Sequence, residues 1–218
     1  TSGTLAIFIN GAQSSTVSNT TTIGTPNRGF VGTQSYDAGA STRSFYGFIC
    51  DVRCSVVTRS ISLPTAPLAV IDSKLLLNMA DGQAIDSAAQ NNLTLYGNAK
   101  ISTGQAKFGN TSMVFDGTGD YVMFDTLNGP LEGLSTTSPA TIEGYFNWDG
   151  TQESGGFRTV IGINRLSDGN NTLVLYCGNS SGQGILGLRY SGGSEQVLDS
   201  SIATNTWHHF AMVLNSSS

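Results

Sequence analysis

The sequence predicts an all-β protein that folds as an antiparallel β-sandwich of the jelly-roll type. Short runs of β-branched and aromatic residues alternate with Gly, Asn, Asp and Ser turn residues along all 218 residues. No stretch shows a 3.6-residue apolar period with helix caps. About a dozen short strands separated by turn signals are typical of sandwiches and jelly rolls.

The individual strands follow from these runs in chain order. Thr4–Asn10 (TLAIFIN) precedes Gly11, and the Asn-Gly pair predicts a tight turn after the first strand. The later runs are bounded by similar turn residues. We expect the further strands at Phe45–Val57, Leu75–Met79, Leu93–Tyr96, Ser112–Phe115, Tyr121–Phe124, Ala140–Trp148, Phe157–Ile163, Thr172–Cys177, Ile185–Tyr190, Glu195–Asp199 and Trp207–Leu214.

Ser60–Leu68 (SISLPTAPL) interrupts this pattern. Pro64 and Pro67 lack a backbone N–H and favour extended chain outside a sheet. The segment 60–68 is therefore expected to be a linker between a short part, 1–59, and a long part, 69–218.

The composition excludes some functions. Charged residues make up 11% of the chain and the net charge is −5, whereas an average soluble domain has roughly 25% charged residues. Because the sequence contains no basic cluster, we do not expect a nucleic-acid partner. No apolar run approaches the ~20 residues of a transmembrane helix, so membrane insertion is not expected either. A neutral, hydrogen-bonding surface suits an extracellular or virion protein and contact with sugars.

The cysteines are Cys50, Cys54 and Cys177, an odd number. Cys50 and Cys54 lie four residues apart in one expected strand, so they should point the same way about 13 Å apart. This separation is too large for a disulfide. Buried free thiols are the expected state.

Several motifs of the long part occur in the order found in one family. Lys107–Val122 (KFGNTSMVFDGTGDYV), Ala140–Gly150 (ATIEGYFNWDG) and Thr206–Val213 (TWHHFAMV) resemble the signature strands of laminin-G-like modules, which have the concanavalin-A-like jelly-roll fold. Lys74–Met79 and Asp86–Leu95 resemble the opening of such a module.

The rest of the family pattern stands at the other end of the chain. Leu5–Gly11 (LAIFING) resembles the strand that directly follows the Trp-His-His strand, and Arg28–Gly32 and Phe48–Arg53 resemble the closing strand. The resemblance implies one module cut open at a hairpin, with its C-terminal part at 1–59 and its N-terminal part at 69–218. Thr1–Thr58 should then pair with Trp207–Leu214, within the chain or in a neighbouring copy.

Two origins of this order stay open: a slice of a tandem array, or a permuted single domain. The Pro-containing linker resembles those between tandem modules of marine tailed-phage structural proteins. That resemblance implies a virion or extracellular location and neighbouring copies of the module as partners.

Catalytic residues are not expected, and we interpret the chain as non-enzymatic. Retaining glycosidases place two carboxylates about 5–5.5 Å apart, whereas Glu143 is the only carboxylate in its expected strand. His208 and His209 are adjacent in a strand, so they should face opposite sides.

A sugar site would combine aromatic and planar polar side chains. Glu143, Tyr145 and Asn147 share one face of their strand, opposite the core-facing Ile142 and Phe146. Trp148 ends that strand, where an aromatic ring at the rim could stack on a sugar. The predicted ligand-binding residues are Glu143, Tyr145, Asn147, Trp148, Arg158, Tyr176 and Arg189; the alternative is that each belongs to the core or the ordinary surface.

Calcium is the candidate cofactor. Ca²⁺ takes six to eight oxygen ligands, and laminin-G-like modules often bind it at the sandwich rim. The predicted ligands, which lie in turns or in the closing strand, are Asp51, Asp86, Asn91, Asp116 and Asp120. The alternative is that these side chains cap turns.

Two functions follow from these observations. The first is a carbohydrate- or surface-binding module whose ligand is a glycan or cell-surface group. The second is a purely structural virion decoration or filament building block.

Overall fold

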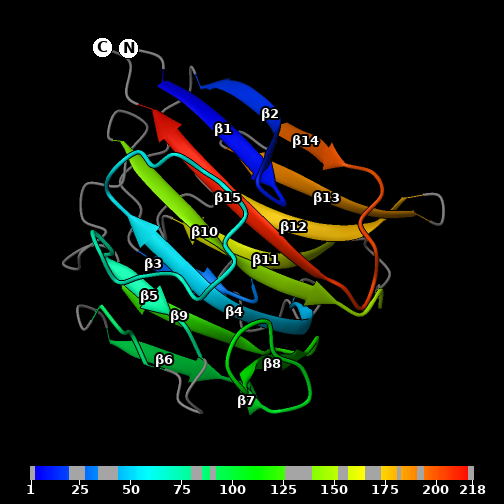
Figure 1. Ribbon diagram of the computed structural model, residues 1–218. Coiled ribbons are helices and arrows are strands. Elements are labelled where there is room, and N and C mark those ends of the chain that lie inside the picture. Colours follow the sequence, from blue (N-terminus) through cyan, green and yellow to red (C-terminus); the bar gives the residue numbers. More distant parts are fainter. Residues whose placement is uncertain are drawn as a thin grey trace.

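The computed structural model is a β-sandwich of two antiparallel sheets (Figure 1). It describes residues 3–19, 28–33, 44–79, 85–88, 92–125, 139–151, 157–164, 173–180, 183–190 and 194–215, which contain 15 strands and no helix. Within these ranges, nothing forms a helix long and apolar enough to cross a membrane. The predicted all-β sandwich is thus confirmed.

The two sheets differ in size and strand order. The eight-stranded sheet has the order β2 (Ala12–Asn19), β1 (Gly3–Ile9), β15 (Trp207–Asn215), β10 (Ala140–Trp148), β4 (Tyr46–Ser55), β8 (Ser112–Asp116) and β7 (Lys100–Ser102), with β5 (Leu75–Leu77) also paired to β4. The seven-stranded sheet has the order β14 (Ser194–Asp199), β13 (Gln183–Tyr190), β12 (Leu173–Ser180), β11 (Phe157–Asn164), β3 (Arg28–Val31), β9 (Tyr121–Asp125) and β6 (Leu93–Tyr96).

Every strand expected from its apolar run is present, with small shifts at the ends. The sequence pattern missed β2, whose run AQSSTVSN is mostly polar, and β7, which has only three residues. β3, expected as part of a closing strand, pairs with β9 and β11 in the seven-stranded sheet, whereas β4 lies in the other sheet.

The short and long parts of the chain combine into one sandwich. β1 pairs antiparallel with β15 from Thr4↔Asn215 to Ile9↔Phe210, and β4 pairs antiparallel with β10. The backbone N–H of Asn10 donates to the His209 carbonyl at 2.9 Å, which continues the ladder into the turn. The expected pairing of the first segment with the Trp207 strand therefore occurs within this chain.

A β-bulge changes the side-chain alternation of β4. Asp51 has φ 56°, and the pairing with β10 shifts register so that Asp51 and Val52 face one residue, Gly144. As a result Cys54 joins the core, while Cys50 lies beside Tyr145 on the opposite face. The expectation that the two cysteines point the same way was wrong, because an extra residue inverts the two-residue period. All three cysteines are free and buried, as expected.

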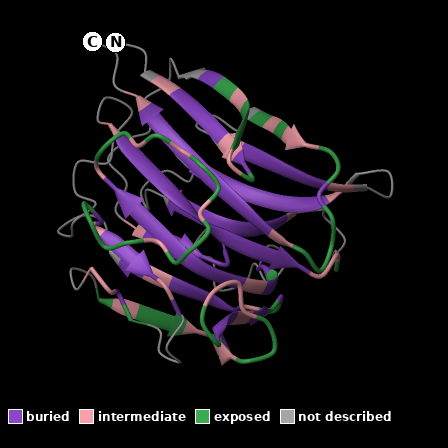
Figure 2. Ribbon diagram, viewed as in Figure 1, coloured by how far each residue is buried: buried purple, intermediate pink, exposed green. Residues whose placement is uncertain are grey.

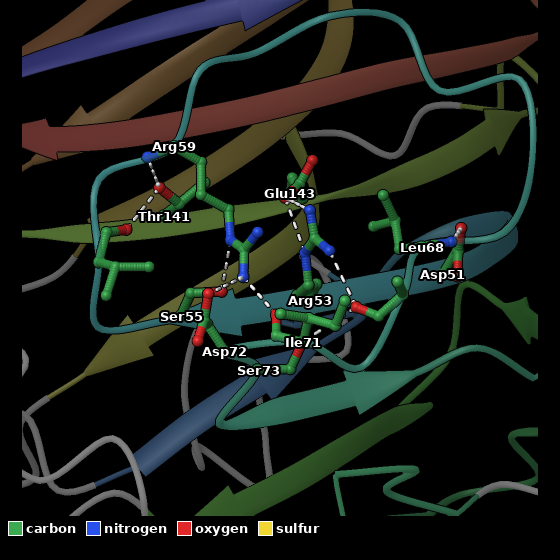
Figure 3. Close-up of polar contacts among 12 residues, drawn as sticks. Asp51, Arg53, Ser55, Arg59, Leu68, Ile71, Asp72, Ser73, Thr141 and Glu143 are labelled. Atoms are coloured by element: carbon green, nitrogen blue, oxygen red, sulfur yellow. Dashed lines mark hydrogen bonds and ion pairs between the residues drawn. The ribbon is translucent and has the colours of Figure 1, made fainter.

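The predicted linker lies against the sheet. Residues 59–73, called the strap below, cross the outer face of β10 and β4 (Figures 1 and 3). Tyr145 Oη donates to the Pro64 carbonyl at 2.8 Å, the Leu68 N–H donates to Asp51 Oδ2 at 2.8 Å, and Arg53 Nη1 donates to the Ala69 carbonyl at 2.9 Å. The chain bends between the two prolines, which lack a backbone N–H, and carbonyls of the strap accept hydrogen bonds from the sheet.

A substitution at Gly47 of β4 can test how closely β4 packs against β10. It has φ 141°, and a Cβ built there would overlap the Asn147 carbonyl oxygen. We expect Gly47→Ala to lower the free energy of unfolding by about 3 kcal/mol or more, measured by urea denaturation. Gly119→Ala is the control: its φ is 74° but its Cβ would meet nothing within 4 Å, so about 1 kcal/mol should be lost. Equal losses would contradict this account.

Candidate functional site

Two of the first three predicted ligand-binding residues, Glu143 and Tyr145, lie beneath the strap. Glu143, Tyr145 and Asn147 share the outer face of β10, and Ile142 and Phe146 belong to the core on the other face, as the alternation predicted. However, the exposed fractions of these three residues are 3%, 0% and 4%. The strap and Phe108 both pack against Tyr145, and a ligand has no access to these buried side chains.

Glu143 is the centre of a buried polar cluster. Arg53 Nε donates to Glu143 Oε1 at 2.9 Å, and Arg53 Nη2 donates to the same oxygen. His209 Nε2 lies 3.6 Å from Glu143 Oε2, and its ring packs against Tyr145 with a centroid distance of 5.0 Å. Burial raises the pKa of Glu143, but His209 and Arg53 lower it by more, so the pKa ends below its ordinary value. The carboxylate thus stays ionised and stabilises the strap-covered face.

His208 and His209 face opposite sides of β15, as expected from their adjacency. His208 packs against Phe146 with a centroid distance of 5.4 Å, and its Nε2 lies 2.9 Å from the Ala203 carbonyl oxygen. His209 lies on the Tyr145 side. His208 therefore lies on the core side of the sheet and His209 on its outer side.

Trp148 and Arg158 are interior residues. Trp148 is fully buried, because it points to the same side of β10 as the core residues Ile142 and Phe146. Its Nε1 donates to the Thr151 carbonyl at 3.3 Å. Arg158 is 2% exposed, and its Nη1 donates to backbone carbonyls of residues 44 and 117. The expectation that Trp148 is a rim aromatic was wrong on this geometry.

Tyr176 and Arg189 lie on the outer face of the seven-stranded sheet. Their strands, β12 and β13, are neighbours, and β11 with Arg158 is next in order, as expected. Tyr176 is 3% exposed and packs against Phe157 with a centroid distance of 4.4 Å. Arg189 forms an ion pair with Glu195 across β13 and β14. The seven predicted residues are therefore divided among three places and do not form one site.

The predicted calcium ligands are also dispersed, except for one pair. Asp116 and Asp120 flank the β8–β9 turn, and Asp120 Oδ2 accepts the Asp116 N–H at 2.9 Å. Asp120 Oδ1 accepts the Asn98 N–H, and Asp116 accepts the Asn98 side-chain amide and the Thr118 N–H. All four carboxylate oxygens thus accept hydrogen bonds within the turn region, in line with the turn-capping alternative.

The other predicted calcium ligands lie elsewhere. Asp86 Oδ1 accepts the backbone N–H groups of Leu76 and Ala88, at 2.8 and 2.9 Å, and Asn91 lies outside the described residues. Asp51 lies under the strap. Among the described residues no group of three or more His, Cys, Asp or Glu side chains could hold a metal ion. These residues therefore do not fit a preformed calcium site.

A hollow lies instead at the β6 end of the seven-stranded sheet. It has a volume of about 220 Å³, and its lining residues are Arg28, Asn92, Thr94, Met123 and Phe124. These residues come from β3, β6 with its preceding residue, and β9, which are adjacent in the sheet order. Arg28 Nη1 donates to Met123 Sδ at 3.5 Å, which places the guanidinium across the strands. The volume is below the roughly 300–1,000 Å³ of drug-sized pockets.

An aromatic pair lies next to this hollow along the same strands. Tyr96 and Tyr121 are cross-strand partners, and their rings stack with a centroid distance of 4.3 Å and an interplanar angle of 15°. Thr94 and Met123 are the next same-face pair, about 7 Å away along the strands. The hollow and the tyrosine pair thus adjoin on one face, where Asn92 and Thr94 are exposed, Tyr96 is half-buried and Tyr121 is buried.

Sequence reasoning missed these residues for a physical reason. Arg28 was part of a segment matched to a closing strand, and the pairing of β3 with β9 is long-range. The available signal was the alternation Asn92, Thr94, Tyr96 in an otherwise apolar run, which puts three hydrogen-bonding side chains on one face.

Comparison of the chain with protein-family models, with curated proteins and with solved structures gave no match.

The buried ion pair gives a first prediction for this region. Glu143→Gln should lower the free energy of unfolding by about 3–5 kcal/mol, because it leaves the buried Arg53 guanidinium without its counter-charge. Glu195→Gln is the matched control, since the Arg189–Glu195 pair is 25% and 35% exposed and should contribute less than about 1 kcal/mol. Urea denaturation of both variants measures the two losses of stability. Similar losses would show that the buried pair contributes no more than the exposed one.

The environment of Asp51 predicts that the stability of the protein depends on pH. Burial raises the pKa of Asp51 to about 6, against the opposing effects of the Leu68 N–H and Arg53. The folded protein therefore holds the Asp51 proton more tightly than the unfolded chain, whose Asp has a pKa of about 4. The resulting contribution to stability is fully present below pH 4 and is lost as the pH rises through 6. Asp51→Asn removes the charge while keeping a side chain that tolerates positive φ.

Between pH 4 and pH 7.5, the wild type should therefore lose about 1–3 kcal/mol of stability relative to Asp51→Asn. Thermal or urea unfolding across this pH range measures the difference. Parallel stability curves would contradict the raised pKa of Asp51.

Proposed function

We propose that the protein is a non-enzymatic carbohydrate-binding module of an extracellular or virion surface, and that it binds a sugar at the β3–β6–β9 face. The single observation that carries this proposal is the hollow lined by Arg28, Asn92 and Thr94 beside the stacked Tyr96–Tyr121 pair. Sugars are recognised by planar polar side chains that bond hydroxyls and by aromatic rings that pack against C–H faces.

The chemistry of the face supports a small neutral ligand. The Arg28 guanidinium, the Asn92 amide and the Thr94 hydroxyl line the hollow together with Met123 and the core residue Phe124. Its volume suits one ring rather than a long chain. The low proportion of charged residues in the chain, 11%, agrees with recognition through hydrogen bonds.

The burial of Glu143, Asp51 and Asp120 supports a binding role over catalysis. Glu143 is held as the partner of Arg53, and Asp51 and Asp120 are 1% exposed. The proposed sugar site does not depend on calcium, because the carboxylate oxygens of Asp116 and Asp120, the only predicted ligands brought together in the described chain, already accept hydrogen bonds.

The first experiment is a glycan-array screen of the purified chain, run once with calcium and once with EDTA. Reproducible binding in both conditions supports a metal-independent sugar site. Binding abolished by EDTA would make calcium essential. A blank array from folded protein in both conditions would reject the proposal in favour of a structural role.

Variants then locate the site. For a glycan found on the array, Tyr96→Ala and Asn92→Ala should each weaken binding about tenfold or more, because each removes about 1.4 kcal/mol of contact. Tyr46→Ala is the matched control, since Tyr46 is 37% exposed on β4 in the other sheet. Isothermal titration calorimetry measures the affinities. Equal losses of affinity in Tyr46→Ala and Tyr96→Ala would show that the site does not lie on this face.

A further inference from the structure

The strap is anchored to the sandwich by backbone groups at both of its ends. At its start the Arg59 N–H donates to Thr141 Oγ1 at 3.1 Å, and just after its end the Lys74 N–H donates to the Cys54 carbonyl at 2.8 Å. Between these anchors, its hydrogen bonds to the sheet are made with the side chains of Asp51, Arg53 and Tyr145. The middle of the strap can therefore open while its two ends stay in place.

Burial of apolar side chains does little to hold the strap down. Figure 2 shows it as largely exposed chain that lies across buried strands. The exposed fractions of Leu63, Val70 and Ile71 are 48%, 51% and 67%. Segments that bury few apolar contacts open at the lowest cost in free energy. Closure of the strap thus depends on the three sheet side chains that bind it.

Asp51 is the one of these three side chains whose contact changes with pH. Its Oδ2 accepts the Leu68 N–H at 2.8 Å, whereas its Oδ1 is buried and has no hydrogen-bond partner in the described chain. The neighbouring cation, Arg53, directs its donors to Glu143 and to the Ala69 carbonyl. A buried carboxyl with one hydrogen bond and no direct counter-charge favours its neutral form, and repulsion by Glu143 adds to this preference.

The other titratable groups near Asp51 come from β4, β10, β15 and the segment before β8, and the strap residues 60–71 carry none. Burial raises the pKa of Cys50 to about 12 and raises that of Tyr145, while His209 and Arg53 lower the pKa of Glu143. His209, 3.6 Å from Glu143, is the further group of a type that changes its charge near neutral pH. The complete set is Cys50, Arg53, Lys107, Glu143, Tyr145 and His209.

We propose that the strap is a pH-sensitive cover, which is closed over Asp51 in mildly acidic solution and opens in its middle when the Asp51 carboxyl ionises. Opening admits water to Oδ1 and gives the charged carboxylate the hydrogen bonds that the closed structure lacks. It also exposes the Tyr145 hydroxyl, which the Pro64 carbonyl covers in the closed state. The strap and the β3–β6–β9 face lie on different sheets, so this inference does not depend on sugar binding.

The direction of the pH effect follows from where the proton is held more tightly. Burial raises the pKa of Asp51 to about 6 in the closed state, whereas an aspartate in water has a pKa of about 4. Closure is therefore favoured most below pH 4, and this advantage is lost as the pH rises through 6. A difference of about two pKa units changes the ratio of open to closed strap by at most about 100-fold.

Hydrogen exchange of the Leu68 amide, measured by NMR on the purified chain, tests the cover. Its protection factor, which is corrected for the pH dependence of intrinsic exchange, should fall about tenfold or more between pH 4.5 and pH 7.5. At pH 7.5 the Leu68 amide should also be about tenfold or more less protected than the amides of β15, because the strap opens without the rest of the sandwich. Equal protection of the two would show that the strap opens only in global unfolding, and would overturn the proposal.

Two variants assign the effect to Asp51. Asp51→Asn keeps an acceptor for the Leu68 N–H but has no proton to lose, so the protection of Leu68 should no longer depend on pH. Asp72→Asn is the matched control: Asp72 also has a positive φ, of 55°, but its side chain is 63% exposed at the end of the strap, so the wild-type pH dependence should remain. A wild type without pH dependence would overturn the proposal, and so would a pH dependence that persists in Asp51→Asn, which would assign it to His209.

Discussion

The Arg53 guanidinium joins the three segments from which this sandwich is built. Arg53 belongs to β4, in the first part of the chain; its ion-pair partner Glu143 belongs to β10, in the second part; and the Ala69 carbonyl that it also binds belongs to the strap between them (Figure 3). Because the guanidinium has a fixed planar set of donors, one side chain sets the spacing of all three segments. The register of β4 against β10 and the path of the strap are thus coupled.

This arrangement has an energetic consequence for the outer face of the eight-stranded sheet. Ionised groups buried without partners would be strongly unfavourable, so the strap must supply polar groups as it covers them. It does so through its backbone, at Pro64, Leu68 and Ala69. In return the strap leaves several of its own apolar side chains in water, with Ile71 67% exposed. The strap is therefore held mainly by hydrogen bonds to the sheet rather than by burial of apolar area.

The sequence was sufficient to predict the fold but not the site. Alternation and turn residues predicted the strands, and the resemblance of Leu5–Gly11 and Thr206–Val213 to consecutive strands predicted the β1–β15 pairing, because both signals are local or ordered along the chain. The Tyr145 hydroxyl donates to Pro64 of the strap across 81 residues of sequence, and Glu143 pairs with Arg53 across 90. An irregular segment rich in proline carries no periodicity, so its path could not be predicted. The bulge at Asp51 likewise inverted one face assignment without a sequence signal of its own.

The distribution of covered and open surfaces explains why we place recognition at one end of the molecule. The strap covers the outer face of β10 and β4, and the β2–β14 contacts join the two sheets along one side. β3, β6 and β9 lie at the other side, where exposed hydrogen-bonding side chains, stacked aromatic rings and an uncharged strand edge occur together. The concentration of these features on adjoining strands supports the proposal that this face is used for binding.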